Sequence, residues 1–298
     1  MAATIHVGTS GYSFKDWIGT VYPKGTASGD MLPYYARFFD TVEVNSTYYR
    51  VPSPYLFENM LKKVPTDFTF VVKLPKEMTH ERGKFDNVVA SFREGIAPLL
   101  GTGQLGGLLA QFPYSFKAGP EGLEHLRRLA KAVGGWGIPV NVEFRHAGWY
   151  DEAVYATLAD LSLGFVNVDL PPLSGLPGAS NVTTSDVAYY RFHGRNAKLW
   201  WRHPTPSHRY DYLYNDEELE RWAQRIEETA GSVKTTYIFH NNCHLGQSVV
   251  NALQLHQRFN LETPTLPPGL APELFTLGID EEIAALKTRI EQARAAER

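Results

Sequence analysis

Short β-rich runs alternate with helical patterns along most of the chain. In residues 140–146, apolar residues at every second position alternate with Asn141, Glu143 and Arg145. This period of two is typical of a β-strand with two different faces. Similar short runs, each closed by a polar residue, Gly or Pro, make eight strand-like segments: residues 5–8, 41–44, 68–73, 106–111, 139–145, 165–169, 187–193 and 235–241.

Helical patterns lie between most of these runs. Apolar positions spaced three and four apart predict helices over residues 33–39, 54–63, 87–99, 120–133, 151–161, 216–229 and 245–259. Two connections lack a clear helix. Residues 171–186 are rich in Pro and Gly, whereas residues 195–215 are aromatic and basic.

This alternation predicts parallel strands joined by crossover helices. Eight such units in about 250 residues match the size of a (β/α)8 TIM barrel. A doubly wound open sheet is the alternative, and it is less favoured because open sheets rarely hold eight equal parallel strands. We expect one barrel domain over residues 1–260, then a Pro-rich linker and a C-terminal helix over residues 261–298. That helix either docks on the outside of the barrel, which we favour, or contacts a second subunit.

Polar side chains recur near the carboxyl ends of the predicted strands, while the amino ends are apolar. In a TIM barrel these carboxyl ends form the mouth, where active sites lie. The mouth candidates, strand by strand, are Glu43, Asn45, Lys73, Gln111, Glu143, Arg145, Asn167, Asp169, Tyr189, Arg191, His193 and Asn241.

From these residues we predict two groups. A pair of carboxylates, a histidine and a lysine suit acid–base catalysis, and the predicted catalytic group is Glu43, Glu143, His193 and Lys73. Cationic, amide and aromatic side chains suit substrate binding, and that group is Asn45, Arg145, Arg191, Asn241, Tyr12, Trp17, Gln111, Asp169 and Trp149. For several of them a structural interpretation stays open.

The structural interpretations are specific. Glu143 and Arg145 could form an ion pair in the barrel centre, since such networks also perturb carboxylates. His193 precedes a glycine and could have only a structural role in a turn. Lys73 could be a surface residue at a strand end. Asn241 could simply tie loop backbones together.

The composition is that of an ordinary soluble globular protein, with a net charge of −3 and 20% charged residues. No stretch approaches the roughly 20 apolar residues of a membrane span, and the N-terminus lacks the features of a secretory signal. The only cysteine, Cys243, excludes an intrachain disulfide and suits a reducing compartment. We therefore expect a cytoplasmic protein without membrane partners; the oligomeric state is not determined.

Cofactor and metal motifs are absent or misplaced. Residues 101–106 match G-x-G-x-x-G but follow a helix and precede a strand, the reverse of a dinucleotide site. We therefore expect no cofactor. A metal site could be drawn from Glu143, Asp169, His193 and His240, but Lys73 and the nearby arginines would share that volume. Because cations repel a divalent ion, we predict an anion there and no metal.

An ordered set of segments resembles one known family, DUF72, also called YecE-like. The segments are HVGTSGY (6–12), Trp17, Tyr22-Pro23, VEVNSTYY (42–49), FVVKLP (70–75), Thr79-His80, QFP (111–113), VEFRH (142–146), Trp149, YRFHGR (190–195), Phe239 and Asn241-Asn242. The resemblance implies a TIM barrel with the mouth residues at the family's motif positions. It implies no activity, because none is established for the family. Cys243 departs from the expected pattern, and the tail after Phe259 lies outside the resemblance.

Three functional hypotheses follow. We favour an enzyme, a hydrolase, lyase or isomerase, that acts on a small phosphorylated or carboxylated molecule at the barrel mouth. The second is a nucleic-acid-binding or -processing protein, because residues 200–203 and 208–210 interleave aromatic and basic side chains. The net charge argues against it, and a lid over a small pocket is the favoured reading of that loop. The third is a sensor that binds a ligand without catalysis.

Overall fold

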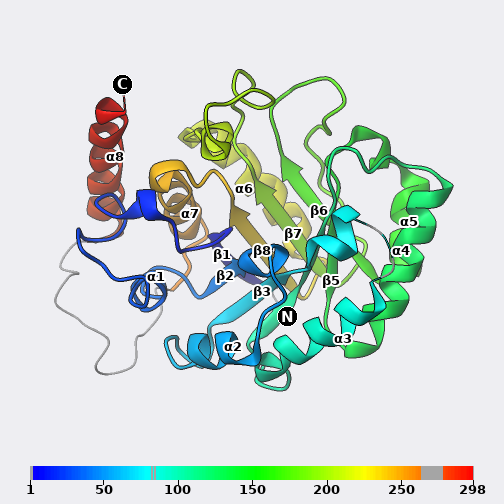
Figure 1. Cartoon of the computed structure of the whole chain (residues 1–298). Helices are drawn as coiled ribbons and strands as arrows, with labels where there is room; N and C mark the ends of the chain where they lie inside the picture. The colour runs from blue at the N-terminus through cyan, green and yellow to red at the C-terminus, as the bar shows by residue number, and fades with distance from the viewer. Residues whose placement is uncertain (1–2, 82, 84, 263–277, 298) are drawn as a thin grey trace.

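A single sheet of eight parallel strands forms the centre of the molecule (Figure 1). The computed structural model describes residues 3–81, 83, 85–262 and 278–297. The strands are β1 (Thr4–Thr9), β2 (Thr41–Val44), β3 (Thr69–Lys73), β4 (Leu105–Gln111), β5 (Val140–Glu143), β6 (Leu163–Asp169), β7 (Val187–Phe192) and β8 (Thr235–His240). Their hydrogen-bonded order is β1-β8-β7-β6-β5-β4-β3-β2, so the sheet curls into a nearly closed barrel.

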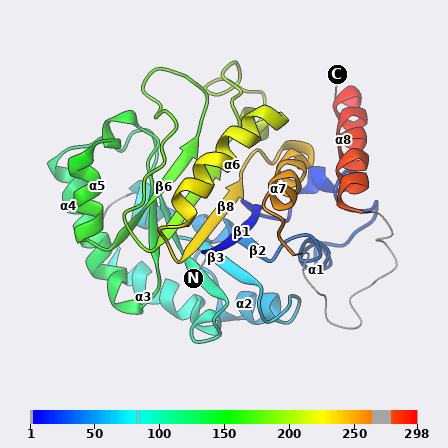
Figure 2. The same ribbon diagram turned by 180° about the vertical axis from the view of Figure 1, so that it is seen from behind.

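Helices surround this sheet in both views (Figures 1 and 2). They are α1 (Met31–Tyr35), α2 (Pro54–Leu61), α3 (Asp86–Gly95), α4 (Pro120–Val133), α5 (Glu152–Asp160), α6 (Asp216–Ala230), α7 (Gln247–Arg258) and α8 (Ile279–Ala296). Residues 170–186 contain no helix, as their Pro and Gly content predicts. The fold is the predicted (β/α)8 barrel. In the described ranges, no helix has the length and apolar character needed to cross a membrane.

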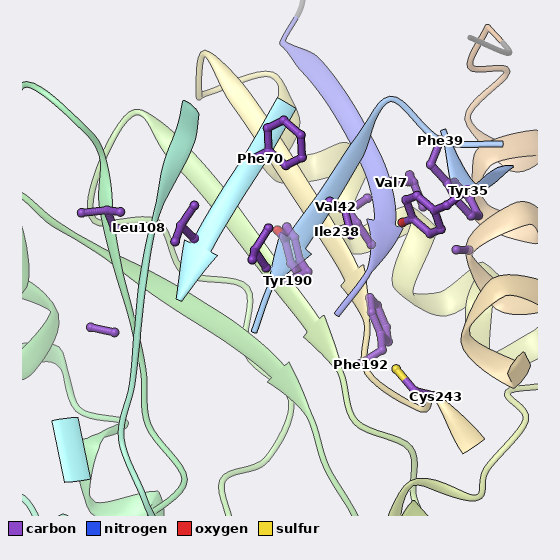
Figure 3. Close-up of a cluster of buried hydrophobic side chains, with 14 of the residues drawn as sticks. Val7, Tyr35, Phe39, Val42, Phe70, Leu108, Tyr190, Phe192, Ile238 and Cys243 are labelled. Carbon is purple, nitrogen blue, oxygen red and sulfur yellow. The ribbon is translucent and has the colours of Figure 1, made fainter. Parts of the chain in front are cut away.

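Apolar side chains fill two separate layers. The larger layer lies between strands and helices, and Figure 3 shows part of it: Val7, Val42, Phe70 and Ile238. The smaller layer fills the barrel interior and includes Val71, Leu109, Val166, Val168, Tyr189 and Phe239. Each of these buried side chains contributes about 1.5–3 kcal/mol to stability. The interior layer forms the floor on which the polar strand ends lie.

The side chain of Tyr35 connects β1 to β2, the two ends of the hydrogen-bonded order. Thr9 donates its backbone N–H to Tyr35 Oη (2.8 Å), and Tyr35 Oη donates to the carbonyl oxygen of Thr41 (3.1 Å). The strands approach closely at Gly8, where a Cβ atom would lie only 2.5 Å from that carbonyl oxygen. A buried phenol and a glycine therefore hold this seam of the barrel together.

Replacing Tyr35 with phenylalanine is expected to lower the free energy of unfolding by about 1–3 kcal/mol. The ring still fits, but buried polar groups on Thr9 and Thr41 lose their partner. Urea denaturation measures the difference. Tyr55→Phe, on a side chain that is 68% exposed, is the matched control and should change little; equal stability of the two variants would contradict a bridging role for Tyr35.

The C-terminal helix α8 packs beside α7, as both views show (Figures 1 and 2). Leu286 and Ile290 are buried at 0% and 2% exposure. Gln257 on α7 donates Nε2–H to Asp280 Oδ1 (2.7 Å) at the start of α8. At the other end of α8, Arg294 pairs with Asp211 in the loop that follows β7. The helix therefore docks on its own barrel, as favoured from the sequence; the predicted linker at 263–269 lies outside the described residues.

Candidate functional site

A cavity of about 630 Å³ opens at the carboxyl ends of the strands. Its walls include many of the residues predicted from strand ends, because alternate side chains of a barrel strand point inward. The predicted residues that line it are Tyr12, Glu43, Asn45, Lys73, Gln111, Arg145, Arg191 and Asn241. A volume of this size suits a small-molecule ligand.

Four charged side chains are linked by ion pairs at this cavity, and three of them, Glu43, Arg145 and Arg191, line it. We call Glu43, Arg191, Glu143 and Arg145 the ion-pair chain. Arg191 donates Nε–H and Nη2–H to the two oxygens of Glu43, at 2.9 and 2.6 Å. Arg191 also pairs with Glu143, and Arg145 donates Nε–H to Glu143 from the other side. The two glutamates are 0% exposed, and the side chains of Arg191 and Arg145 are 2% and 11% exposed.

The ion-pair chain stabilises the charges of Glu143 and Arg191. Burial opposes ionisation of Glu143, but Arg145 and Arg191 outweigh it and hold the pKa of this carboxyl well below its usual range. Burial also opposes the charge on Arg191, but Glu143 and Glu43 raise its pKa above the ordinary value. Arg191 further donates to Ser10 Oγ at 3.2 Å. The structural ion pair that the sequence left open is therefore present, and Arg191 already has anionic partners within the protein.

His193 lies behind the cavity surface rather than on it. Its Nδ1 atom accepts a hydrogen bond from Asn241 Nδ2 (2.9 Å), and its Nε2 atom lies 3.3 Å from Glu143 Oε1. Burial, reinforced by Arg145, lowers the pKa of His193 to about 3, so the ring is neutral at pH 7. We predicted a proton carrier here. The structure instead gives His193 a supporting place between an amide and a carboxylate, without access to a ligand.

Lys73 differs from the other charged groups of the cavity. At the end of β3, its Nζ atom donates to Gln111 Oε1 (2.8 Å) and lies 4.5 Å from the centre of the Tyr48 ring. In the described part of the chain, no carboxylate oxygen lies within 4 Å of Nζ. Burial and the nearby guanidinium of Arg191 lower the pKa of Lys73 to about 7. Lys73 is thus a cavity residue rather than a surface one, and its amine is partly uncharged at neutral pH.

Strand β6 departs from the predicted orientation. Val166 and Val168 point into the barrel, so Asn167 and Asp169 point outward. Asp169 accepts from Trp222 Nε1 (2.6 Å) and Tyr214 Oη (2.9 Å), and it pairs with Arg195. Asn167 accepts from Ser180 Oγ (2.8 Å). The expected place of Asp169 in the substrate site is therefore corrected, because its carboxylate joins the barrel to α6 and the loop after β7.

Two of the predicted aromatic contacts also lie away from the cavity. Trp17 and Trp149 are both 0% exposed. Trp17 donates Nε1–H to the Cys243 carbonyl (2.7 Å), and Trp149 donates Nε1–H to the Phe116 carbonyl (2.7 Å). Their predicted place in the substrate-binding group is therefore corrected, since both indoles donate to loop carbonyls behind the mouth. Tyr12, in contrast, lines the cavity.

Several lining residues were missed from the sequence. Ser10 lies two residues after Gly8, on the inward side of β1. The alternation of inward and outward side chains along the strand could therefore have predicted it. Tyr49, which is 77% exposed, comes from the segment after β2, where the strand alternation carries no signal. Asp16, Tyr210 and His244 also line the cavity from loops.

Two of the four residues that could form a metal site, Asp169 and His240, point away from the barrel interior. His240 points outward and stacks on Phe192, with ring centroids 4.7 Å apart. Burial lowers its pKa to about 3. Asp169 faces α6, as described above. Among the described residues, no group of three or more His, Cys, Asp or Glu side chains is arranged to hold a metal ion.

Comparison with known proteins identifies the family. The model of DUF72, described as a protein of unknown function, matches residues 6–273. The chain belongs to the DUF72 family. Within it, the chain is 30% identical over 284 residues to the UPF0759 protein YunF of Bacillus subtilis, covering 89% of this chain and 98% of YunF. It is 28% identical over 148 residues to YecE of Escherichia coli K12, covering 49% of this chain and 50% of YecE.

Solved DUF72 structures share the architecture. A DUF72 family protein from Thermotoga maritima superposes with a TM-score of 0.79 at 41% identity, covering 86% of this chain and 99% of that one. Another from Enterococcus faecalis has a TM-score of 0.78 at 25% identity, covering 89% and 98%. The family description assigns no activity, so the function has to be argued from the chemistry of the cavity.

Proposed function

We propose that this DUF72 protein is an enzyme that moves protons on a small anionic molecule bound in the cavity at the barrel mouth. The observation that carries the proposal is Lys73. Its amine lies in the cavity wall, has no carboxylate partner in the described chain and has a pKa of about 7. A group that titrates near the working pH serves best as a general acid or base. Of the three reaction classes suggested by the sequence, this favours a lyase or an isomerase.

Arg145 is the proposed ligand for the anionic group. Both arginines line the cavity, but Arg191 is already held by Glu43, Glu143 and Ser10. Among the described residues, Nε is the only atom of Arg145 that makes a close ion pair, and Nη2 has a long contact of 3.4 Å with His193. A guanidinium with this remaining capacity suits a carboxylate or phosphate. The anion site therefore rests on Arg145 and Lys73 rather than on both arginines.

Asn45 offers a neutral contact beside these cations. Its Nδ2 atom donates to Glu43 Oε1 at 2.9 Å. Its Oδ1 atom is buried and has no hydrogen-bond partner among the described residues. An unpartnered buried acceptor in a cavity wall suits a hydroxyl group of a ligand. A small hydroxylated carboxylate or phosphate would thus meet a cation, an acceptor and a titrating amine.

Proton exchange tests the proposed chemistry directly. In deuterium oxide, the protein is expected to speed deuterium incorporation next to the carbonyl of pyruvate or dihydroxyacetone phosphate, followed by NMR. Lys73→Met should reduce this rate by about 10²–10⁴-fold, the usual contribution of one acid–base group. The matched control is Lys117→Met, because Lys117 is exposed and its Nζ lies 3.8 Å from the Tyr114 ring. Full exchange in Lys73→Met would contradict the role of Lys73, and no exchange with either compound would argue against proton transfer.

Inorganic phosphate provides a separate test of the anion site. Isothermal titration is expected to show binding that weakens about tenfold or more in Arg145→Gln, because a charged hydrogen bond of about 1.5–3 kcal/mol is lost. Arg225→Gln is the control, since Arg225 is an exposed arginine 5.3 Å from the Trp222 ring. Arg145 has the corresponding contact, 6.0 Å from the Trp200 ring. Binding without proton exchange would favour the sensor hypothesis, and equal phosphate binding in both variants would remove Arg145 from the anion site.

The loop after β7 supports a pocket wall more than a nucleic-acid surface. Trp200 is 2% exposed and packs against Tyr210, which lines the cavity. Trp201 is 51% exposed. Base stacking needs several exposed aromatic rings along a basic groove. Titration with a single-stranded oligonucleotide at low salt is the direct check, and we expect no binding.

A further inference from the structure

The cavity holds an amine whose surroundings fit covalent chemistry as well as proton transfer. Lys73 Nζ contacts a neutral amide oxygen on Gln111 at 2.8 Å and the π-face of Tyr48 at 4.5 Å. Neither partner requires the amine to be charged. A buried lysine that stays charged is normally paired with a carboxylate, and within the described ranges Lys73 has none at ion-pair distance.

The carboxylates that could stabilise an ammonium at Lys73 are committed elsewhere. Glu43 receives two hydrogen bonds from Arg191 and a third from Tyr189 Oη (2.7 Å). Glu143 is paired with both Arg191 and Arg145. The ion-pair chain thus contributes two guanidinium groups that repel a third cation, while its negative charges are largely balanced. A free amine in such a setting is a nucleophile.

We propose that Lys73 forms an imine with the carbonyl group of its substrate, so that the cavity takes a small aldehyde or ketone that also carries a carboxylate or phosphate. The inference rests on the proposed function and deepens it, because it names both the substrate class and a covalent intermediate. Nothing in the family description assigns such chemistry.

The reaction balances without an external oxidant or reductant. The Nζ lone pair attacks the carbonyl carbon, a C–N bond forms, and the C=O π-pair moves to oxygen. One proton passes from nitrogen to that oxygen. The hydroxyl group then takes up a second proton and leaves as water while the nitrogen lone pair forms C=N. The product is a protonated imine, and an amine plus a carbonyl plus a proton have become an iminium plus water.

The surroundings of Lys73 also suit the product, because the carboxylate or phosphate of the bound substrate brings a negative charge that offsets the iminium. An iminium nitrogen keeps one N–H, which can donate to Gln111 Oε1 as the amine does now. Its positive charge would lie over the Tyr48 ring, where a cation is attracted to the π-face. The iminium withdraws electrons from the neighbouring carbon, so a C–H or C–C bond there becomes easier to break. This explains how one lysine could support either isomerase or lyase chemistry.

Borohydride trapping tests the imine. The wild-type protein is incubated at pH 7 with pyruvate or dihydroxyacetone phosphate and then with sodium borohydride, which reduces an imine to a stable secondary amine. Mass spectrometry of peptides is expected to find one reduced adduct on Lys73, formed about 100-fold or more faster than on Lys117 in the same chain. An exposed lysine with a pKa of about 10.4 has less than about one amine in a thousand free at pH 7.

The comparison of Lys73 with Lys117 uses the unaltered protein, so it does not depend on whether a variant folds. Lys73→Arg is a further check and should remove the adduct, whereas Lys117→Arg should leave it. Equal labelling of the two lysines would overturn the imine. If Lys73-dependent proton exchange occurs without an adduct, Lys73 is a non-covalent base, and the inference fails while the proposed function stands. If an adduct forms without proton exchange, the imine stands and the proposed proton transfer fails.

Discussion

Replacing Glu143 with glutamine is expected to lower the free energy of unfolding by about 3–5 kcal/mol, the usual cost of breaking a buried ion pair from one side. Glu143 is fully buried and pairs with both Arg145 and Arg191. Removing its charge leaves two buried guanidinium groups with only Glu43 to offset them. Urea denaturation at pH 7 measures the effect.

Two further variants separate charge imbalance from a general loss of packing. The double variant Glu143→Gln with Arg145→Gln removes one charge of each sign, so we expect it to recover part of the lost stability. Asp186→Asn breaks an exposed ion pair, in which the side chains of Asp186 and Lys234 are 69% and 81% exposed. This substitution should change the free energy of unfolding little. A Glu143→Gln protein that unfolds at the same urea concentration as Asp186→Asn would show that the buried chain of charges is not a stability element.

Lowering the pH from 7 to 5 is expected to remove about 4 kcal/mol of stability through two buried histidines. Burial lowers the pKa values of His193 and His240 to about 3, whereas an unfolded histidine has a pKa of about 6.5. The folded state therefore binds fewer protons than the unfolded state between pH 6.5 and 3. Their contribution is fully present above pH 6.5 and falls as the pH decreases, by about 2.7 kcal/mol per pH unit for two protons.

His240 allows the effect to be assigned. It stacks on Phe192 outside the cavity, and its ring nitrogens have no hydrogen-bond partners among the described residues. His240→Phe removes one of the two titrations, so the slope of stability against pH should fall by about half. Urea denaturation at several pH values gives this slope. An unfolding midpoint that is the same at pH 7 and pH 5 would contradict the neutral buried state of these histidines.

The ion-pair chain connects stability to the proposed chemistry. Buried charges are costly to desolvate, and apolar residues of similar shape often replace them without loss of stability. The presence of these charges at the cavity is therefore better explained by the electrostatic field that they create at Lys73. Burial and Arg191 are the main influences that lower the pKa of Lys73. A mutation in the chain should consequently change the chemistry of Lys73 as well as the stability of the barrel.

Most of the barrel was predictable because its signals are local. The predicted run 41–44 is β2, and the predicted helix 120–133 is α4, residue for residue. Alternating apolar and polar side chains indicate strands, and Pro or Gly indicates their ends. Neither signal depends on which other part of the chain packs against the strand. Boundaries shifted mainly where helices end in short turns, as at the helix predicted over 33–39, where α1 spans Met31–Tyr35.

Predicting the site depended on the alternation of inward and outward side chains along each strand. This alternation identified residues that line the cavity where one face of the strand is polar. It placed Glu43, Lys73, Gln111, Arg145 and Asn241 correctly at the cavity. The alternation failed for β6 because apolar residues occupy both of its faces: Phe165 packs in the outer layer, and Val166 and Val168 pack in the barrel interior. A polar side chain on such a strand can find its hydrogen-bond partners in the helix layer, as Asp169 does. The sequence does not indicate whether such a side chain faces the helices or the barrel interior.

The sequence by itself determined the eight-unit barrel, its family and the set of polar strand ends at its mouth. Only the tertiary structure decided how those charges combine. Arg191 and Glu43 are 148 positions apart, and their pairing depends on the closure of the sheet rather than on any local pattern. That pairing commits Arg191 to carboxylates, and no carboxylate oxygen of the described residues lies within 4 Å of Lys73 Nζ. The lowered pKa of Lys73 therefore depends on its burial and on Arg191, and both follow from tertiary contacts that leave no periodic trace in the sequence.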